Sequence, residues 1–131
     1  MNKSSAQNFV QLLEDDIKNT SGLIIQLKAE RKTLQNRDIE SLQKSTDEKN
    51  TLLSQLDKNR LERESLLASA GFPVTELGFN TFISKAPTSI QKRWDLLKAQ
   101  LAECKEQNII NGQLIHRGET SANRLLNILR G

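Results

Sequence analysis

The sequence predicts an all-α fold, an elongated antiparallel three-helix coiled-coil bundle with a long, overhanging C-terminal helix. Apolar residues recur at heptad spacing along most of the 131-residue chain. Only 4% of the residues are aromatic and 27% are charged, a composition that suits long helices burying one stripe each. Both prolines, Pro73 and Pro87, fall in one short window, so the rest of the chain can be helical. This length corresponds to a single domain.

The first helix is expected over about residues 5–36. One of its heptad rows contains Val10 and Ile17, and the other contains Leu13 and Leu27. These two rows predict a narrow apolar seam of period 3.5, which is typical of coiled-coil packing. The acidic residues at 14–16 are placed on the solvated side of this helix.

The second helix is expected over about residues 38–70. Asp38 is suited to cap its start, while Gly71 and Pro73 end it. No Gly or Pro separates it from the first helix, so one continuous helix is the alternative. Such a helix would be about 100 Å long and would have no partner in a monomer, which favours a hairpin.

The segment 71–87 is expected to be a packed connection with one short helical turn around Thr81–Lys85. Its helical periodicity stops, yet it is too apolar for a free linker. We expect its large side chains to pack over one end of the hairpin: Phe72, Val74, Leu77, Phe79, Phe82 and Ile83.

The third long helix is expected over about residues 88–130, and Thr88 with Gln91 fits a capping box at its start. It would be about 60 Å long against about 48 Å for each hairpin helix, and so should overhang the hairpin by at least two turns. Trp94 is expected to anchor it to the hairpin. Its heptad seam is interrupted at Asn108–Ile115, where four large aliphatic residues point in several directions around the helix.

Composition and motifs point away from catalysis, cofactors and nucleic acid. The net charge of +3 comes from interspersed charges, so no basic stripe for nucleic acid is present. Cys104, the single cysteine, excludes an internal disulfide, fits a reducing compartment and is expected in the core. His116 lies about 18 Å from Cys104 along one helix, too far for a nucleophile–base pair. No metal site, signal-peptide run or membrane-inserting segment is predicted.

These exclusions leave an interaction protein. A long helix beside an unfilled apolar groove suits binding of an amphipathic helix from a partner. A homo-oligomeric coiled-coil scaffold or adaptor is the alternative, because the same apolar stripe can pair with itself.

The segment Asn108–Leu114, with the sequence Asn-Ile-Ile-Asn-Gly-Gln-Leu, resembles the C-terminal signature of the FlgN family of flagellar type III export chaperones. The resemblance continues through Ile115 to Leu129. Two further parts of the chain are similar to the family, the Lys49-x-x-Leu-Leu-x-x-Leu56 pattern followed by Arg60, and Arg93-Trp94.

The resemblance implies a cytoplasmic chaperone that binds C-terminal helical segments of the hook–filament junction proteins FlgK and FlgL. It prevents their premature assembly and delivers them to the export apparatus, through FlhA or the ATPase complex. Some relatives contact FlhA through a Leu-Tyr-Gly element, but this chain contains no Tyr. Carried onto this sequence, the client-binding residues are Asn108, Ile109, Asn111, Gly112, Leu114, Ile115, Leu125, Leu126 and Leu129.

Overall fold

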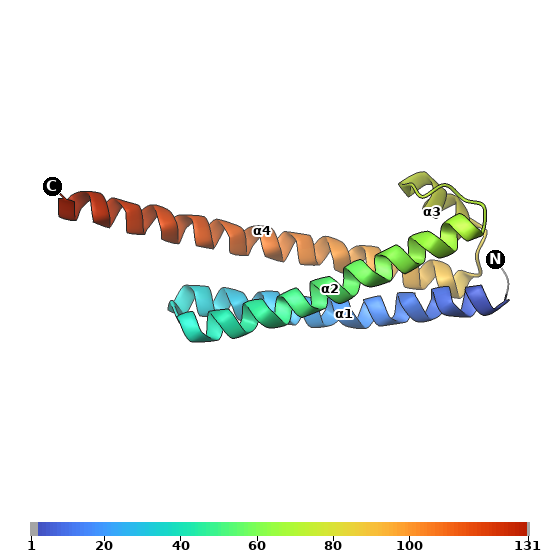
Figure 1. The fold of residues 1–131 in the computed structure, drawn as a ribbon, viewed down its shortest axis with the longest axis horizontal. Coiled ribbons are helices and arrows are strands. Elements are labelled where there is room, and N and C mark those ends of the chain that lie inside the picture. The colour runs from blue at the N-terminus through green and yellow to red at the C-terminus, as the bar shows by residue number, and fades with distance from the viewer. Residues whose placement is uncertain (1–2, 131) are drawn as a thin grey trace.

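A computed structural model describes the backbone of residues 3–130 and the side chains of residues 4–115. It contains four helices and, in these residues, no strand, so the all-α class is confirmed. The helices are α1 Lys3–Asn36, α2 Ile39–Ser69, α3 Glu76–Ser84 and α4 Thr88–Arg130. The molecule is elongated, and α4 extends past the turn between α1 and α2 (Figure 1).

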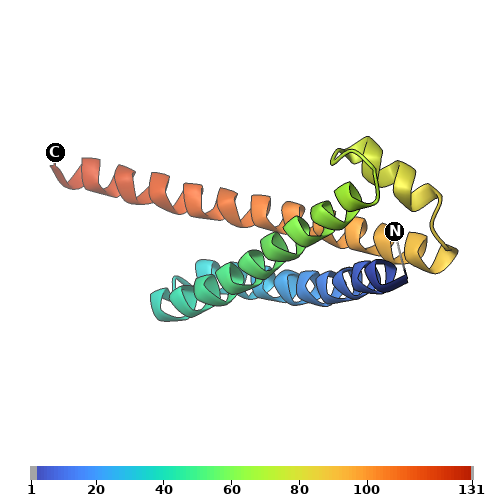
Figure 2. The same cartoon turned by 45° about the vertical axis from the view of Figure 1, so that its right-hand side comes forward.

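Helix α1 is the centre of the fold. Helix α2 runs antiparallel to it and α4 runs parallel to it, and both pack along its length (Figures 1 and 2). Within the described range, α2 and α4 make no close backbone contact with each other. The two outer helices therefore leave an open space between them over α1.

Because α1 serves two partners, its buried face is wider than the predicted seam. Leu13, Thr20 and Leu27 are buried as one of the two predicted rows requires, but Val10 and Ile17 in the other row are only half-buried. The neighbouring row is more deeply buried, and its members are Phe9, Asp16, Leu23 and Glu30. Two of them, Asp16 and Glu30, form ion pairs with α2. A helix between two others buries three adjacent rows, whereas a two-stranded seam buries two.

The buried apolar side chains form two clusters along α1. The first lies at the N-terminal end of α1 and joins it to α3 and α4 through Phe9, Leu13, Ile83, Ile90 and Leu97. The second lies further along and contains Leu23, Leu27 and Cys104, with Leu52 and Leu56 of α2 packed against it. The expectation that Cys104 belongs to the core is confirmed.

The turn between α1 and α2 confirms the helical hairpin. The Asp38 backbone N–H donates to the Thr33 carbonyl (3.0 Å), and the Arg37 N–H donates to the Leu34 carbonyl (3.3 Å). This pattern is a Schellman motif, and it places Arg37 in the left-handed region at φ 53°. Asp38 then caps α2 by accepting a hydrogen bond from the Ser41 N–H (3.2 Å). Hydrogen bonding from the Ser41 side chain, and to a lesser extent from its backbone N–H, lowers the pKa of the Asp38 carboxyl.

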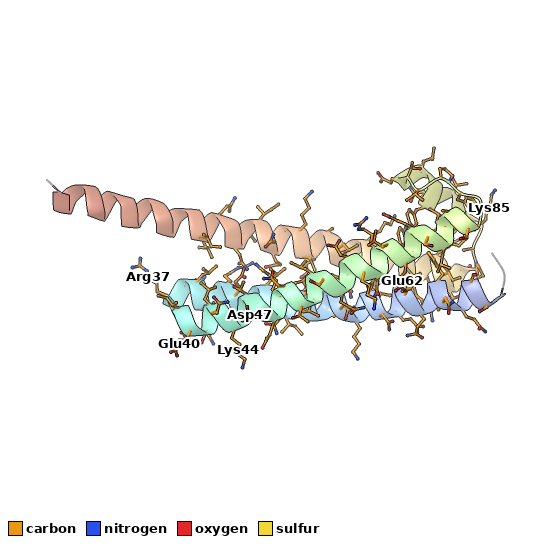
Figure 3. The ribbon with its side chains drawn as sticks, in the orientation of Figure 1. Arg37, Glu40, Lys44, Asp47, Glu62 and Lys85 are labelled. Carbon is orange, nitrogen blue, oxygen red and sulfur yellow. The ribbon has the colours of Figure 1, made fainter. Side chains whose placement is uncertain are left out.

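We expect Arg37→Gly to stabilise the protein by up to about 1 kcal/mol, because glycine adopts a positive φ without the steric cost of a Cβ. The Arg37 side chain is exposed, has no ion pair within the described residues and projects from the turn (Figure 3). Urea denaturation followed by circular dichroism measures the effect. The converse change, Gly71→Arg, replaces a glycine at φ 87° in the corresponding position after α2 and should destabilise the protein. Equal stability of Arg37→Gly and wild type would contradict this account.

The connection after α2 is more regular than expected. In place of one turn around Thr81–Lys85 it forms the nine-residue helix α3, capped by Thr75, whose hydroxyl accepts from the Gly78 N–H (3.0 Å). At Gly78 the helix approaches the Pro73 carbonyl so closely that a Cβ would lie 1.9 Å from its oxygen. A side chain at this position would therefore displace α3.

Most, but not all, of the apolar residues in this connection pack as expected. Phe82 makes edge-to-face contacts with Phe9 (5.1 Å between centroids) and with Phe72 (5.4 Å). Val74 and Leu77 are exceptions, and Leu77 is 75% exposed. A short amphipathic helix packs one face only, which accounts for the exposure of Leu77, whereas Val74 lies in the exposed bend that precedes α3.

Trp94 fastens α3 to α4. Its ring stacks on Phe79 at 5.4 Å with an interplanar angle of 8°, and it also packs against the core at the N-terminal end of α1. The predicted capping box at the start of α4 is not formed as expected. The Gln91 side chain instead donates to the Ala86 carbonyl (3.0 Å) and so ties the preceding turn to α4.

Candidate protein-binding surface

The α1-facing row of α4 consists of Ile90, Leu97, Cys104 and Asn111, all of them buried and spaced seven residues apart. This spacing shows that the heptad continues through the segment where the sequence indicates an interruption. Asn111 is the polar member of this otherwise apolar row. A polar residue at a buried heptad position specifies the register between helices, at some cost in stability.

Asn111 is held by three hydrogen bonds to α1. Its amide nitrogen donates to the Leu27 carbonyl (2.7 Å) and to Oε1 of Glu30 (3.0 Å), and its oxygen accepts from Nε of Arg31 (3.1 Å). The side chain is 1% exposed. In the free protein the surface and the hydrogen-bonding capacity of Asn111 are thus used within the bundle, and its contact with a client stays a prediction.

The same network reaches the third helix. Glu30 is buried and forms an ion pair with Lys49 of α2 (2.9 Å between Nζ and Oε2). A further hydrogen bond joins Arg31 to Gln107 of α4. The network Lys49–Glu30–Asn111–Arg31 thus links all three long helices just before α4 leaves the hairpin.

We expect Asn111→Ala to lower the free energy of unfolding by about 2–3 kcal/mol, because it leaves the buried Glu30 carboxylate and the Arg31 guanidinium short of partners. Urea denaturation gives the magnitude. Asn108→Ala is the matched control, since Asn108 is exposed on the same helix and should change stability by less than about 0.5 kcal/mol. Similar stability of the two variants would show that the network contributes little.

The other predicted site residues with described side chains form an accessible surface on α4. Ile109 is 51% exposed and Ile115 is 43% exposed. Gly112 is also exposed, and a Cβ there would meet nothing within 4 Å, so the backbone is open to close approach. Asn108 is exposed and Leu114 is half-buried. The side chains of Leu125, Leu126, Leu129 and His116 lie outside the described residues.

A groove that the sequence does not reveal lies between α2 and α4, with α1 as its floor. It has a volume of about 570 Å³. Leu23 and Leu27 of α1 lie at the floor, and both walls carry leucines, among them Leu56 of α2 and Leu101 of α4. On α4 the groove ends at Asn108, so it adjoins the exposed surface around Ile109 and Ile115. The sequence does not reveal this groove because it does not show that α2 and α4 stay apart.

A buried ion pair borders this groove. Asp16 is 0% exposed, binds Arg63 of α2 and accepts a hydrogen bond from Nδ2 of Asn59 (2.8 Å). The placement of Asp16 on a solvated side is therefore wrong. Burial lowers the pKa of the Arg63 guanidinium, and its Nε has no hydrogen-bond partner in the described part of the protein.

The described residues offer little for catalysis or metal binding. Burial raises the pKa of the Cys104 thiol, with a smaller contribution from Glu103, so the reactive thiolate is disfavoured. Among these residues no three His, Cys, Asp or Glu side chains are grouped to hold a metal ion. In the described part of the chain, none of the helices combines the length and the apolar character that crossing a bilayer requires.

The fold and this surface define an elongated helical protein built for interaction with other proteins. A family model for the FlgN protein matches residues 1–131, and the chain belongs to the FlgN family of flagellar chaperones. A crystal structure of a flagella synthesis protein, FlgN, from Pseudomonas aeruginosa has the same fold, with a TM-score of 0.76. The two are 27% identical, and the alignment covers 98% of this chain and 99% of that chain. No match was found among curated protein sequences.

Proposed function

We propose that this protein is a cytoplasmic export chaperone for the C-terminal helical segments of FlgK and FlgL. It shields those segments until the subunits reach the flagellar type III export apparatus. The observation that supports this proposal is the exposed aliphatic surface around Ile109, Gly112 and Ile115, together with the extension of α4 past the hairpin. Large aliphatic side chains left exposed beside an open groove are typical of helix-binding surfaces.

The expected affinity is moderate. Burying about 600 Å² of apolar surface is worth about 15 kcal/mol before association costs, at 25 cal/mol per Å². The loss of translational and rotational freedom, and the ordering of a flexible client segment, remove most of this gain. Dissociation constants between micromolar and nanomolar are therefore expected, and they permit release at the export apparatus.

The test is binding of purified C-terminal fragments of FlgK and FlgL, measured by calorimetry and by mass in solution. We expect a monomeric chaperone and a one-to-one complex with each fragment. A stable homo-oligomer that binds neither fragment would instead support the coiled-coil scaffold, because the exposed stripe of α4 would then be used against itself.

A further inference from the structure

We propose that the groove between α2 and α4 receives an amphipathic helix whose apolar stripe is flanked by Asp or Glu residues. The proposal rests on the proposed function, because the helix would belong to the client. It specifies the chemistry of the client helix, and it adds the groove to the surface of α4 as a binding site.

The shape and lining of the groove fit a helix. Six leucines and Cys104 line it, drawn from all three long helices, with Leu53 and Leu56 on one wall and Leu97 and Leu101 on the other. Both wall residues Leu53 and Leu101 are still more than one-third exposed. A helix seated against α1 would cover them and fill the space between α2 and α4, completing a four-helix arrangement.

The charges around this apolar floor are mainly positive. Four cationic side chains line the groove, Lys49, Arg60, Arg63 and Lys105, against the two carboxylates of Asp16 and Asp57. Lys105 has no ion pair in the described part of the chain, and Arg60 is held only by exposed pairs on its own helix. Exposed pairs of this kind exchange partners at little cost, so both cations are available to a carboxylate on the occupant.

Arg63 supplies a second indication of an anionic partner. The residue is 8% exposed and lines the groove, and its Nε is buried without a hydrogen-bond acceptor in the described part of the protein. A buried donor without a partner is uncommon in folded proteins. A carboxylate on the seated helix would be attracted to the Arg63 guanidinium, and it would reach this N–H after the arginine side chain turns toward the groove, whereas a lysine or arginine there would meet like charge. Nucleic acid, the other polyanion, does not suit a floor made of leucine side chains.

The test reverses two accessible charges of the groove. Arg60→Glu combined with Lys105→Glu should weaken binding of the FlgK and FlgL fragments at least tenfold, and higher salt should reduce the difference. Lys58→Glu combined with Lys92→Glu is the matched control, since both lysines are exposed, lie on the same two helices and do not line the groove. Circular dichroism verifies that every variant is folded.

Two other outcomes separate this proposal from the chaperone assignment. If wild type, the groove variant and the control bind the fragments equally, the groove is not the seat and this proposal fails, while the chaperone function stands. If wild type binds neither fragment, the chaperone assignment fails. Binding of a designed helical peptide with a leucine stripe, made in a Glu-flanked and a Lys-flanked version, then tests whether the groove prefers acidic helices. Preference for the Glu-flanked peptide that the groove variant abolishes supports the proposal, and absence of that preference overturns it.

Discussion

Replacing Ile109 and Ile115 with Asp is expected to weaken binding of the FlgK and FlgL fragments at least about 100-fold. Each isoleucine, when buried by a partner, contributes about 1.5–3 kcal/mol, and an aspartate in its place must also be desolvated. Both side chains are about half exposed in the free protein and belong to neither buried cluster, so the double variant should keep its helicity and its urea midpoint. Calorimetry measures the affinity, and circular dichroism measures the fold.

The structure determines this choice of residues. Leu114 is a sequence neighbour of Ile115, but it is half-buried and follows Gln107, which faces α1, by one heptad. A charge at Leu114 would therefore mix a loss of packing with a loss of binding.

The matched control is Ala99→Asp combined with Ala102→Asp. It adds the same two charges to exposed positions of α4 that neither line the groove nor belong to the surface around Ile109 and Ile115. This control should bind the fragments as wild type does. If the isoleucine variant also binds as tightly as wild type, the client contacts another surface.

Replacing Arg63 with Met is expected to lower the free energy of unfolding by about 3–5 kcal/mol, the range for removing one partner of a buried ion pair. Asp16 would remain fully buried with only the Asn59 amide as a partner. Urea denaturation, with helicity monitored by circular dichroism, measures the loss of unfolding free energy. The variant should also unfold at markedly lower temperature.

Two further variants separate charge pairing from packing. Arg60→Met removes an exposed arginine from the same helix and should change stability by less than about 1 kcal/mol. Asp16→Leu combined with Arg63→Met removes both charges and should recover much of the stability lost in the single variant. If the double variant is as unstable as Arg63→Met alone, the cost comes from lost packing and not from the unpaired Asp16.

Most of the helical organisation was predictable because it depends on local chemistry. Heptad spacing, the Asp38 cap and the Gly71 and Pro73 stop signals are read within a few residues of where they act. The Asp16 and Asn111 positions were harder, because a polar residue in an amphipathic helix usually faces solvent. One signal was present in the sequence: Asp16 lies one heptad after Phe9 and one before Leu23, and Asn111 lies one heptad after Cys104.

The candidate site was predictable only in part, for the same reason. The sequence identifies Asn108–Ile115 as unusual, and its exposed members Ile109, Gly112 and Ile115 remain candidates for client contact. It does not separate them from Asn111, whose amide is satisfied by groups roughly eighty positions earlier in the chain. Hydrogen bonds between distant segments leave no periodic pattern in a single sequence.

From the sequence alone follow the all-α class, the hairpin and the long last helix, because periodicity and capping act within one element. Only the tertiary structure decided that α1 is the central helix and that α2 and α4 diverge from it. That arrangement buries Asn111 and Asp16 and leaves Leu53 and Leu101 facing an open groove. Burial is a property of which helices meet, so the same heptad row is core where a partner helix covers it and binding surface where none does.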